Sequence, residues 1–354
     1  MSLNDVAQQL YASKQYIHQL EMNIQKPNEM FVQALADVFE IKPSFFYRNY
    51  ENRIYEGECY FRKAKSTPTH IKEKAVHCAA LLEDYIVFIE NEFDLPEVQF
   101  DLQQFDFQID DYKQYTNSDI EKLTEQVRLK FGLGLDRPID NMVRVLENNG
   151  VIVTYFRPLL DKVDAFSINR VRPIVIRNSE KENVCRQRFD LAHECGHLIL
   201  HKFSEMEIED PLKEEQANRF ASAFLLPRTA FIREFAPAFG RYINWNYLFE
   251  LKKRWKVSFA AIIRRAYDLG LIDAIKYRSA YIYLRKTGQM KTEKGDNLLS
   301  LEQVELLPEI TSELLKNFKK SLDYFLENVG FSYDLLGAVT NFNFSSILDC
   351  NQFS

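Results

Sequence analysis

The chain has 354 residues, a length that is large for one average domain and predicts two or three. With 46% hydrophobic and 27% charged residues, it has the composition of a globular protein that can bury a sizeable core. The net charge of −6 and the pI near 5.7 argue against a protein that coats nucleic acid, although they leave room for a local basic face.

The cysteines and the amino terminus indicate the compartment. The five cysteines are odd in number and form no CxxC pair, which is typical of a reduced, intracellular protein. The first residues lack the basic stretch and apolar run of a signal peptide. The most apolar helical stretch, "AVHCAALLEDYIVFIENEF", is interrupted by Glu83 and Asp84 before it could cross a bilayer. We therefore expect a soluble, cytoplasmic protein without a membrane partner.

Residues 1–50 are predicted to form short helices separated by tight turns. Apolar residues between Leu3 and Leu10 share one helical face, and Ser13 can cap a second helix. Pro27 opens a turn before a third helix. The short turn between the first two helices is typical of a helix-turn-helix, so we interpret this segment as a DNA-binding domain.

The second helix of such a motif enters the major groove, and its first residues touch base edges. Gln15 can bond adenine bidentately, whereas Lys14 or Ser13 is better placed for phosphate. Residues 1–50 carry four bases against five acids, so a single copy should bind duplex DNA weakly and a homodimer would help. A protein-docking or dimerising module is the alternative. The candidate DNA contacts are Ser13, Lys14, Gln15, Tyr16 and His18.

Three further regions follow. Residues 51–115 are predicted as a helical connector and linker, with a basic stretch, one long helix and an acidic end. Residues 116–275 form a domain that begins with a helix capped by Asn117 or Ser118 and includes about three strands, in "VIVTYF" and "DAFSI…PIVIRN". Residues 276–354 give mixed strand and helix signals and have no role that we can name.

The segment "HECGH" carries the clearest chemistry. His193 and His197 are four residues apart, so on a helix both imidazoles lie on one face. Glu194 projects beside them, where its carboxylate could accept a proton from metal-bound water. This HExxH spacing suits zinc, although a merely structural helix can contain it too.

A catalytic zinc site needs a third protein ligand. His201 is badly placed, since eight residues beyond His193 it lies about 12 Å along the helix and about 80° round it. We expect it to support the site or the structure. Glu214 on the next predicted helix is the better ligand, with Asn218 on the same face to hold a histidine by a hydrogen bond. Glu215 stays as the alternative, because the sequence does not set the rotation of that helix.

Two histidines and one carboxylate leave a coordination position for water, whose pKa a bound zinc lowers to about 7. Glu194 can then take the proton as the water attacks a carbonyl, so the set predicts amide hydrolysis.

Cys195, within the motif, is expected in the core. The run "LKKRWK" is interpreted as a solvated helix face, and Tyr155 and Tyr242 are guesses for stabilising an oxyanion.

The segment "RFDLAHECGHLILH" followed by "EEQANRFASAFLLPRTAF" resembles the ImmA/IrrE family of zinc metallopeptidases. In that family a glutamate helix follows HExxH and ends in a Leu-Leu-(Met/Leu)-Pro run, here "FLLP" at 224–227. Residues 3–48 resemble an XRE-type (Cro/C1-like) helix-turn-helix that lacks its usual first helix and is in that sense truncated. The likeness covers roughly residues 3 to 275.

The resemblance implies an α+β, mainly helical chain: a helix-turn-helix bundle, a helical connector, a gluzincin-like HExxH metallopeptidase domain with a small antiparallel sheet, and a mixed C-terminal region. It implies that His193, His197 and Glu214 bind Zn²⁺ and that Glu194 is the general base. Members are implied to cleave a repressor protein.

We therefore expect a cytoplasmic transcriptional regulator whose zinc endopeptidase cleaves a repressor or antitoxin-like protein, held along an edge strand such as 164–169. The alternative is a DNA-binding transcription factor whose peptidase-like domain senses metal or a ligand without proteolysis. A protein–protein adaptor is the third interpretation.

Overall fold

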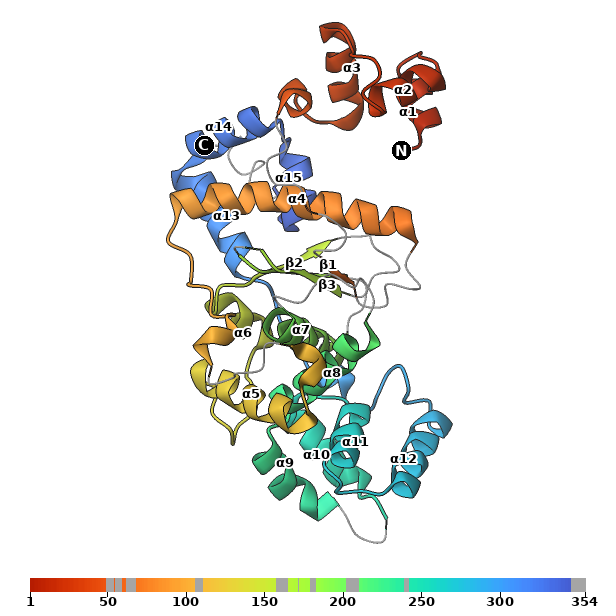
Figure 1. Cartoon of the computed structure of the whole chain (residues 1–354), viewed down its shortest axis with the longest axis vertical. Coiled ribbons are helices and arrows are strands. Elements are labelled where there is room, and N and C mark those ends of the chain that lie inside the picture. The colour runs from red at the N-terminus through yellow and green to blue at the C-terminus, as the bar shows by residue number, and fades with distance from the viewer. Residues whose placement is uncertain are drawn as a thin grey trace. The chain divides into compact units, whose positions relative to one another are not determined.

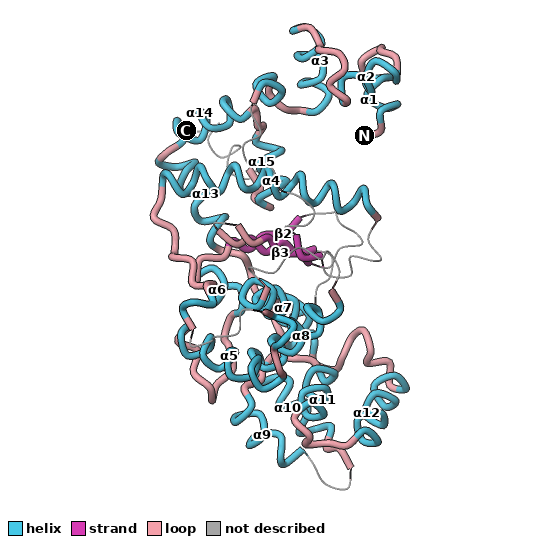
Figure 2. The backbone as a smooth tube through the Cα atoms, viewed as in Figure 1, coloured by secondary structure: helices cyan, strands magenta, loops and turns pink. Residues whose placement is uncertain are grey.

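The computed structural model describes residues 1–48, 54, 59–61, 68–105, 111–156, 165–170, 172–178, 183–201, 210–238 and 242–344. The described chain is mainly helical with one small sheet, as Figure 2 shows, and the predicted α+β class is confirmed. None of its described helices combines the length and apolarity needed to span a bilayer.

The chain divides into two compact units that are not contiguous in sequence. The helical unit consists of Met1–Ile54, His77–Phe93 and Leu307–Ser354. The sheet unit consists of Tyr55–Val76 and Asp94–Leu306.

Three short helices begin the helical unit: α1 (Leu3–Gln9), α2 (Lys14–Glu21) and α3 (Glu29–Phe39) (Figure 1). Ser13 caps α2, because its side-chain oxygen accepts a hydrogen bond from the Tyr16 amide at 3.1 Å. Only a short turn separates α1 from α2, as the sequence predicts. The small core of the three helices consists of Val6, Ala7, Ile17 and Leu35.

A 3₁₀ turn, η1 (Pro43–Tyr47), docks this bundle on the C-terminal helices. The Lys42 amide donates to the Gly330 carbonyl at 3.0 Å, and Ser44 Oγ donates to the Glu327 carbonyl at 2.5 Å. Gly330 has a φ of 75° and packs directly against the Phe45 backbone, where a side chain would not fit. The C-terminal helices therefore support the amino-terminal ones.

The supporting helices are α13 (Leu306–Asn317), α14 (Lys319–Val329) and α15 (Tyr333–Thr340), and they pack with the larger part of α4 (Thr69–Glu92). Phe88 of α4 stacks on Phe325, with ring centroids 4.5 Å apart. The expectation of strands in the tail is wrong for its described part, which is helical, because its apolar residues recur at helical spacing.

The sheet has the order β1-β3-β4-β2. Its strands are β1 (Cys59–Phe61), β2 (Ile152–Phe156), β3 (Ala165–Ile168) and β4 (Ile174–Asn178). β3 pairs antiparallel with both β1 and β4, but β2 pairs parallel with β4. The predicted antiparallel sheet is thus wrong for one pair, since β2 adds to the far side of β4 and strand composition does not encode direction.

β1 corrects two further expectations. It lies in the segment that we predicted as a helical connector, which is therefore not wholly helical. Because β1 pairs with one side of β3 at Phe166 to Ile168 and β4 pairs with the other, β3 is not a free edge strand; position 164 of the predicted segment 164–169 lies outside the described residues. An extended substrate therefore finds no open backbone edge on β3 in this structure.

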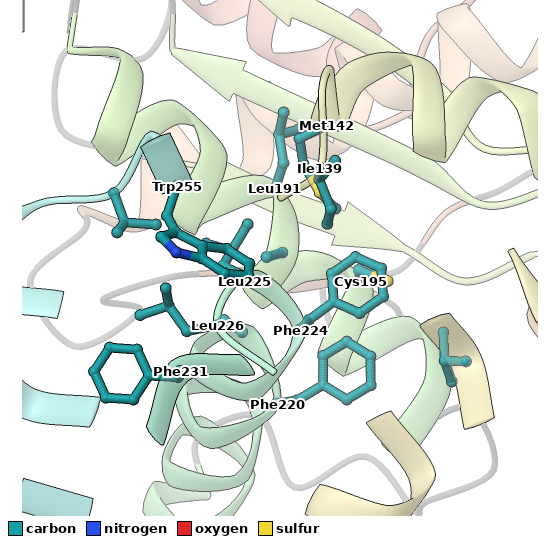
Figure 3. Packing of buried hydrophobic residues seen from close by; sticks show 14 of the residues in the cluster. Ile139, Met142, Leu191, Cys195, Phe220, Phe224, Leu225, Leu226, Phe231 and Trp255 are labelled. Carbon is teal, nitrogen blue, oxygen red and sulfur yellow. The ribbon is translucent and has the colours of Figure 1, made fainter. Parts of the chain in front are cut away.

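Helices cover one face of the sheet, with α6 (Met142–Asn148) beside β2 and α7 (Val184–Leu200) beside β3 (Figure 1). α5 (Asn117–Lys130) and α8 (Pro211–Leu225) pack beyond them. Figure 3 shows the apolar core between these helices, where the aromatic rings of Phe220 and Phe224 lie side by side. The cap of α5 is Thr116, not Asn117 or Ser118, because the Thr116 hydroxyl and the Asp119 carboxylate bond each other's backbone amides.

Two buried arginines hold the carboxyl end of α8. Arg128 donates to the Phe224 carbonyl, and Arg265 donates to the Leu226 carbonyl at 3.0 Å. Such carbonyls carry partial negative charge that a cation stabilises. Arg265 also makes a two-pronged ion pair with Glu121 of α5. The position of α8 is therefore set by buried polar contacts as well as by apolar packing.

Four helices complete the sheet unit: α9 (Arg228–Phe235), α10 (Trp245–Trp255), α11 (Phe259–Asp268) and α12 (Ala274–Lys286). α10 bears out the interpretation of "LKKRWK" as a solvated helix face for the exposed Lys253 and Arg254, but not for Lys252. Lys252 is only 1% exposed, and its Nζ lies 2.6 Å from Glu293 and 2.5 Å from Asp296. It is buried because it shares the inner helix face with Leu248 and Trp255, four residues before and three after.

An extended segment before α13 binds the sheet unit through Glu302. The Glu302 carboxylate accepts hydrogen bonds from the Met142 and Val143 amides and pairs with Arg188. The Gln187 side-chain amide exchanges two hydrogen bonds with the Glu302 backbone, at 2.7 and 2.9 Å. This part of the C-terminal region thus closes over α6 and α7.

The buried pair of Arg265 and Glu121 gives a stability prediction. Arg265→Leu should lower the free energy of unfolding by about 3–5 kcal/mol, because it leaves the Glu121 carboxylate buried and unpaired. The neighbouring Arg264→Leu removes a pair with Asp268 in which the arginine side chain is 52% exposed, and should cost less than about 1 kcal/mol. Urea unfolding of both variants checks this, and equal losses would contradict it.

Candidate metal centre

α7 brings the residues of the HExxH segment together inside the sheet unit. His193 and Glu194 are 0% exposed and His197 is 2% exposed. The Nε2 atoms of the two histidines lie 3.0 Å apart, as their spacing of four residues predicts. Both imidazoles are therefore buried and face one point.

A glycine lets α8 reach this point. A Cβ atom at Gly196 would lie 3.2 Å from the backbone of Ala217 and 3.2 Å from the Phe220 side chain, which is tighter than ordinary van der Waals contact, so glycine suits this close approach of α8. With glycine there, Glu214 Oε1 lies 3.1 Å from His197 Nε2, and Glu214 Oε2 lies 3.5 Å from His193 Nε2. The close approach of the two helices thus delivers the carboxylate.

His193, His197 and Glu214 could hold a metal ion, since one ligand atom from each lies within 4.8 Å of the others. A tetrahedral zinc ion with bonds of 2.0–2.1 Å separates its ligand atoms by about 3.3 Å. The separations of 3.0, 3.1 and 3.5 Å lie close to that value. Glu215 is exposed and outside the group, so the structure favours Glu214 of the two alternatives.

The protonation states also suit a metal. Burial lowers the pKa of His197 and leaves its imidazole neutral at pH 7. Burial by itself would raise the pKa of Glu214, but the contacts with His193 and His197 outweigh it and hold that pKa below its usual range. Metal ligands must be deprotonated, and these groups are.

Each histidine of the pair has a partner on its other ring nitrogen. His193 Nδ1 lies 3.1 Å from Asn218 Oδ1, the contact that we expected of Asn218. His197 Nδ1 lies 3.0 Å from His201 Nδ1. His201 is therefore not in the metal-facing group, and burial holds its pKa well below its usual value. Such outer contacts orient metal-bound imidazoles.

Glu194 has a partner that sequence reasoning missed. Ser167 of β3 donates its hydroxyl to Glu194 Oε2 at 2.5 Å, and both residues are fully buried. A serine within the apolar strand "AFSI" was the available signal, because a hydroxyl buried in a core requires a polar partner. The contact holds one oxygen of the Glu194 carboxylate in place.

The remaining candidates lie elsewhere. Cys195 is fully buried in the apolar core, as expected. Tyr155 is half-buried, and its hydroxyl bonds Gln187 and the Glu302 carbonyl, whereas Tyr242 is 77% exposed. The DNA candidates belong to the helical unit, where Tyr16 packs its ring on Phe31. The other four, Ser13, Lys14, Gln15 and His18, are exposed.

The buried histidines predict how the metal-free protein responds to acid. The pKa values of His197 and His201 are lowered on folding, so below about pH 6.5 the unfolded chain binds more protons than the folded one. The free energy of unfolding should therefore decrease as the pH is lowered, by up to about 1.4 kcal/mol per pH unit for each histidine. The lowered pKa of Glu214 extends the loss in the same direction below about pH 4.5.

Urea unfolding with a chelator between about pH 7 and pH 5 measures this slope. His18→Gln is the control, because it removes an exposed histidine that is remote in sequence from α7. A flat profile in the unsubstituted chain would contradict the lowered pKa values.

Comparison with known proteins gives one family. Residues 146–267 match the model of the IrrE N-terminal-like domain, Peptidase_M78, which is a metallopeptidase family. The match begins in α6 and ends in α11, so it contains the sheet strands β2 to β4 and every candidate metal ligand. No curated protein matches the chain. Residues 146–267 are therefore similar to a metallopeptidase domain of the IrrE N-terminal-like type.

Proposed function

We propose that this chain is a zinc-dependent endopeptidase. The observation that carries the proposal is the convergence of His193, His197 and Glu214, with Glu194 on the same helix turn and held by Ser167. Three protein ligands are the usual complement of catalytic zinc, which keeps a position for water or substrate. The similarity of residues 146–267 to a metallopeptidase domain supports the same conclusion.

The roles of the side chains follow from their chemistry. Zinc bound to the three ligands would polarise a peptide carbonyl and make a water molecule more acidic. The Glu194 carboxylate would accept a proton from that water and return it to the leaving nitrogen, as a general base and then a general acid. Ser167 would keep the carboxylate turned toward the histidines, since its hydroxyl holds one oxygen at 2.5 Å.

The helical unit gives the proposal a regulatory setting. Its helices α1 and α2 have helix-turn-helix spacing, and Ser13, Lys14, Gln15 and His18 are exposed on and before α2. We propose that the protein is a cytoplasmic transcriptional regulator that contacts duplex DNA, as a homodimer, through this helix. Its substrate would then be a repressor or antitoxin-like protein.

One observation favours the alternative of a non-proteolytic sensor. His193 and Glu194 are 0% exposed, and only the Glu214 side chain of the metal-facing group, at 42%, reaches solvent. A site closed in this way suits a bound ion that stabilises the fold better than it suits a bulky peptide. The peptidase and the sensor differ in the effect of removing the general base Glu194: only the peptidase would lose its activity.

Metal content tests the site itself. The unsubstituted protein should hold about one zinc per chain, and His193→Ala and Glu214→Ala should each hold little, because each removes one of three ligands. Glu215→Ala is the matched control, since Glu215 is the exposed neighbour on α8. Elemental analysis after dialysis measures this, and zinc lost equally from Glu215→Ala would reject Glu214 as the ligand.

Glu194→Gln separates peptidase from sensor. The variant should keep its zinc, because Glu194 is not in the metal-facing group, and should lose about 10²- to 10⁴-fold in hydrolysis of a quenched-fluorescent peptide library. Ser167→Ala should lose less, about 10- to 100-fold. If Glu194→Gln retains both zinc and the regulatory effect in cells, the sensor function replaces the peptidase.

A further inference from the structure

Behind His197 lies a chain of polar contacts that ends at the main chain of another segment. His201 follows His197 by one helical turn, and its Nε2 lies 3.0 Å from Gln216 Oε1 of α8. Gln216 in turn donates from its amide nitrogen to the Tyr112 carbonyl at 2.7 Å. All of these groups are buried, so each must satisfy its hydrogen bonds within this chain.

The Tyr112 carbonyl decides which way the Gln216 amide points. A carbonyl oxygen can only accept, so the amide nitrogen must face it and the amide oxygen must face His201. Tyr112 is itself well anchored. It belongs to the turn η5 (Tyr112–Gln114), its hydroxyl bonds the Asp210 cap of α8 at 2.7 Å, and its ring contacts His201 edge-on.

The orientation of the Gln216 amide in turn determines which nitrogen of His201 carries the hydrogen. Because Gln216 Oε1 accepts, the hydrogen of the neutral His201 imidazole must lie on Nε2. His201 Nδ1 therefore has a lone pair, and it faces His197 Nδ1 at 3.0 Å. The hydrogen in that contact must belong to His197 Nδ1, which leaves His197 Nε2 without one.

The other histidine, His193, has a single hydrogen-bonding contact on its outer nitrogen. His193 Nδ1 faces Asn218 Oδ1, and with the amide in this orientation its hydrogen lies on Nδ1 and its Nε2 also has a lone pair. Two lone pairs and the Glu214 carboxylate thus meet within 3.0 to 3.5 Å. Three electron-rich groups at that separation repel one another unless a proton or a metal cation lies between them.

We propose that Gln216 and His201 are positioning residues that set the tautomer of the metal ligand His197, with the Tyr112 carbonyl as the fixed end of the chain. This inference rests on the proposed metal site and adds how that site is prepared before the metal arrives. His201 is thereby assigned a role other than that of a ligand, because both of its ring nitrogens are already engaged.

The metal-free protein tests the tautomers directly. In the full chain labelled with ¹⁵N-histidine, two-bond ¹H–¹⁵N correlations distinguish Nδ1–H from Nε2–H, and single-histidine replacements assign the six histidines. We expect His201 as Nε2–H and His197 as Nδ1–H before any zinc is added. His197 found as Nε2–H, or His201 as Nδ1–H, would overturn the proposal.

Gln216→Met tests the consequence, because it keeps the size of the side chain and removes the acceptor. Zinc affinity, measured by competition with a chelator, should weaken by about 10- to 100-fold, and the Nε2–H preference of His201 should be lost. Glu215→Gln, its exposed neighbour, should change neither. Unchanged affinity and unchanged tautomers in Gln216→Met would overturn the assignment.

A second pair of variants keeps the test decisive if Gln216→Met does not fold. His201→Gln can still offer His197 Nδ1 an acceptor, whereas His201→Phe cannot, so His201→Gln should bind zinc the more tightly. Equal affinities would contradict the proposal. If the unsubstituted protein binds no zinc, the proposed function fails, and the tautomers of the metal-free protein still decide the positioning role.

Discussion

The close packing of α7 against α8 at Gly196 is the contact on which the candidate site depends. The histidines come from α7 and the carboxylate from α8, so the site exists only while the two helices stay at this separation. The same contact brings Asn218 and Gln216 to the outer nitrogens of the histidines. The ligand geometry and the contacts behind it thus share this one close approach of the two helices.

Several buried charges in this core have hydrogen-bonding partners on neighbouring helices. Arg128 and Arg265 satisfy the carbonyls at the end of α8, and Glu302 satisfies the first amides of α6. An isolated buried charge would be costly, but each of these charges has hydrogen-bonding partners around it. The rigid frame that results is what a metal site needs, because ligands must be held in place before the ion binds.

The two compact units interleave along the chain. Residues 77–93 and the C-terminal helices pack with the amino-terminal bundle, whereas the extended segment around Glu302 binds the sheet unit. The segment around Glu302 therefore contacts α6 and α7 before the chain enters the helical unit at Leu307. The amino-terminal bundle of α1 to α3, which is docked through Lys42 and Ser44 on C-terminal helices, depends on residues far from it in sequence.

The sequence determined what local spacing controls. The four-residue interval of His193 and His197, the Ser13 cap and the buried Cys195 follow from helix geometry, which acts over neighbouring residues. Only the tertiary structure decided what depends on contacts between distant segments. The rotation of α8 selected Glu214 over Glu215, the pairing of β1 closed the edge of β3, and the inner face of α10 buried Lys252. These outcomes come from long-range packing, and no local pattern of residues encodes it.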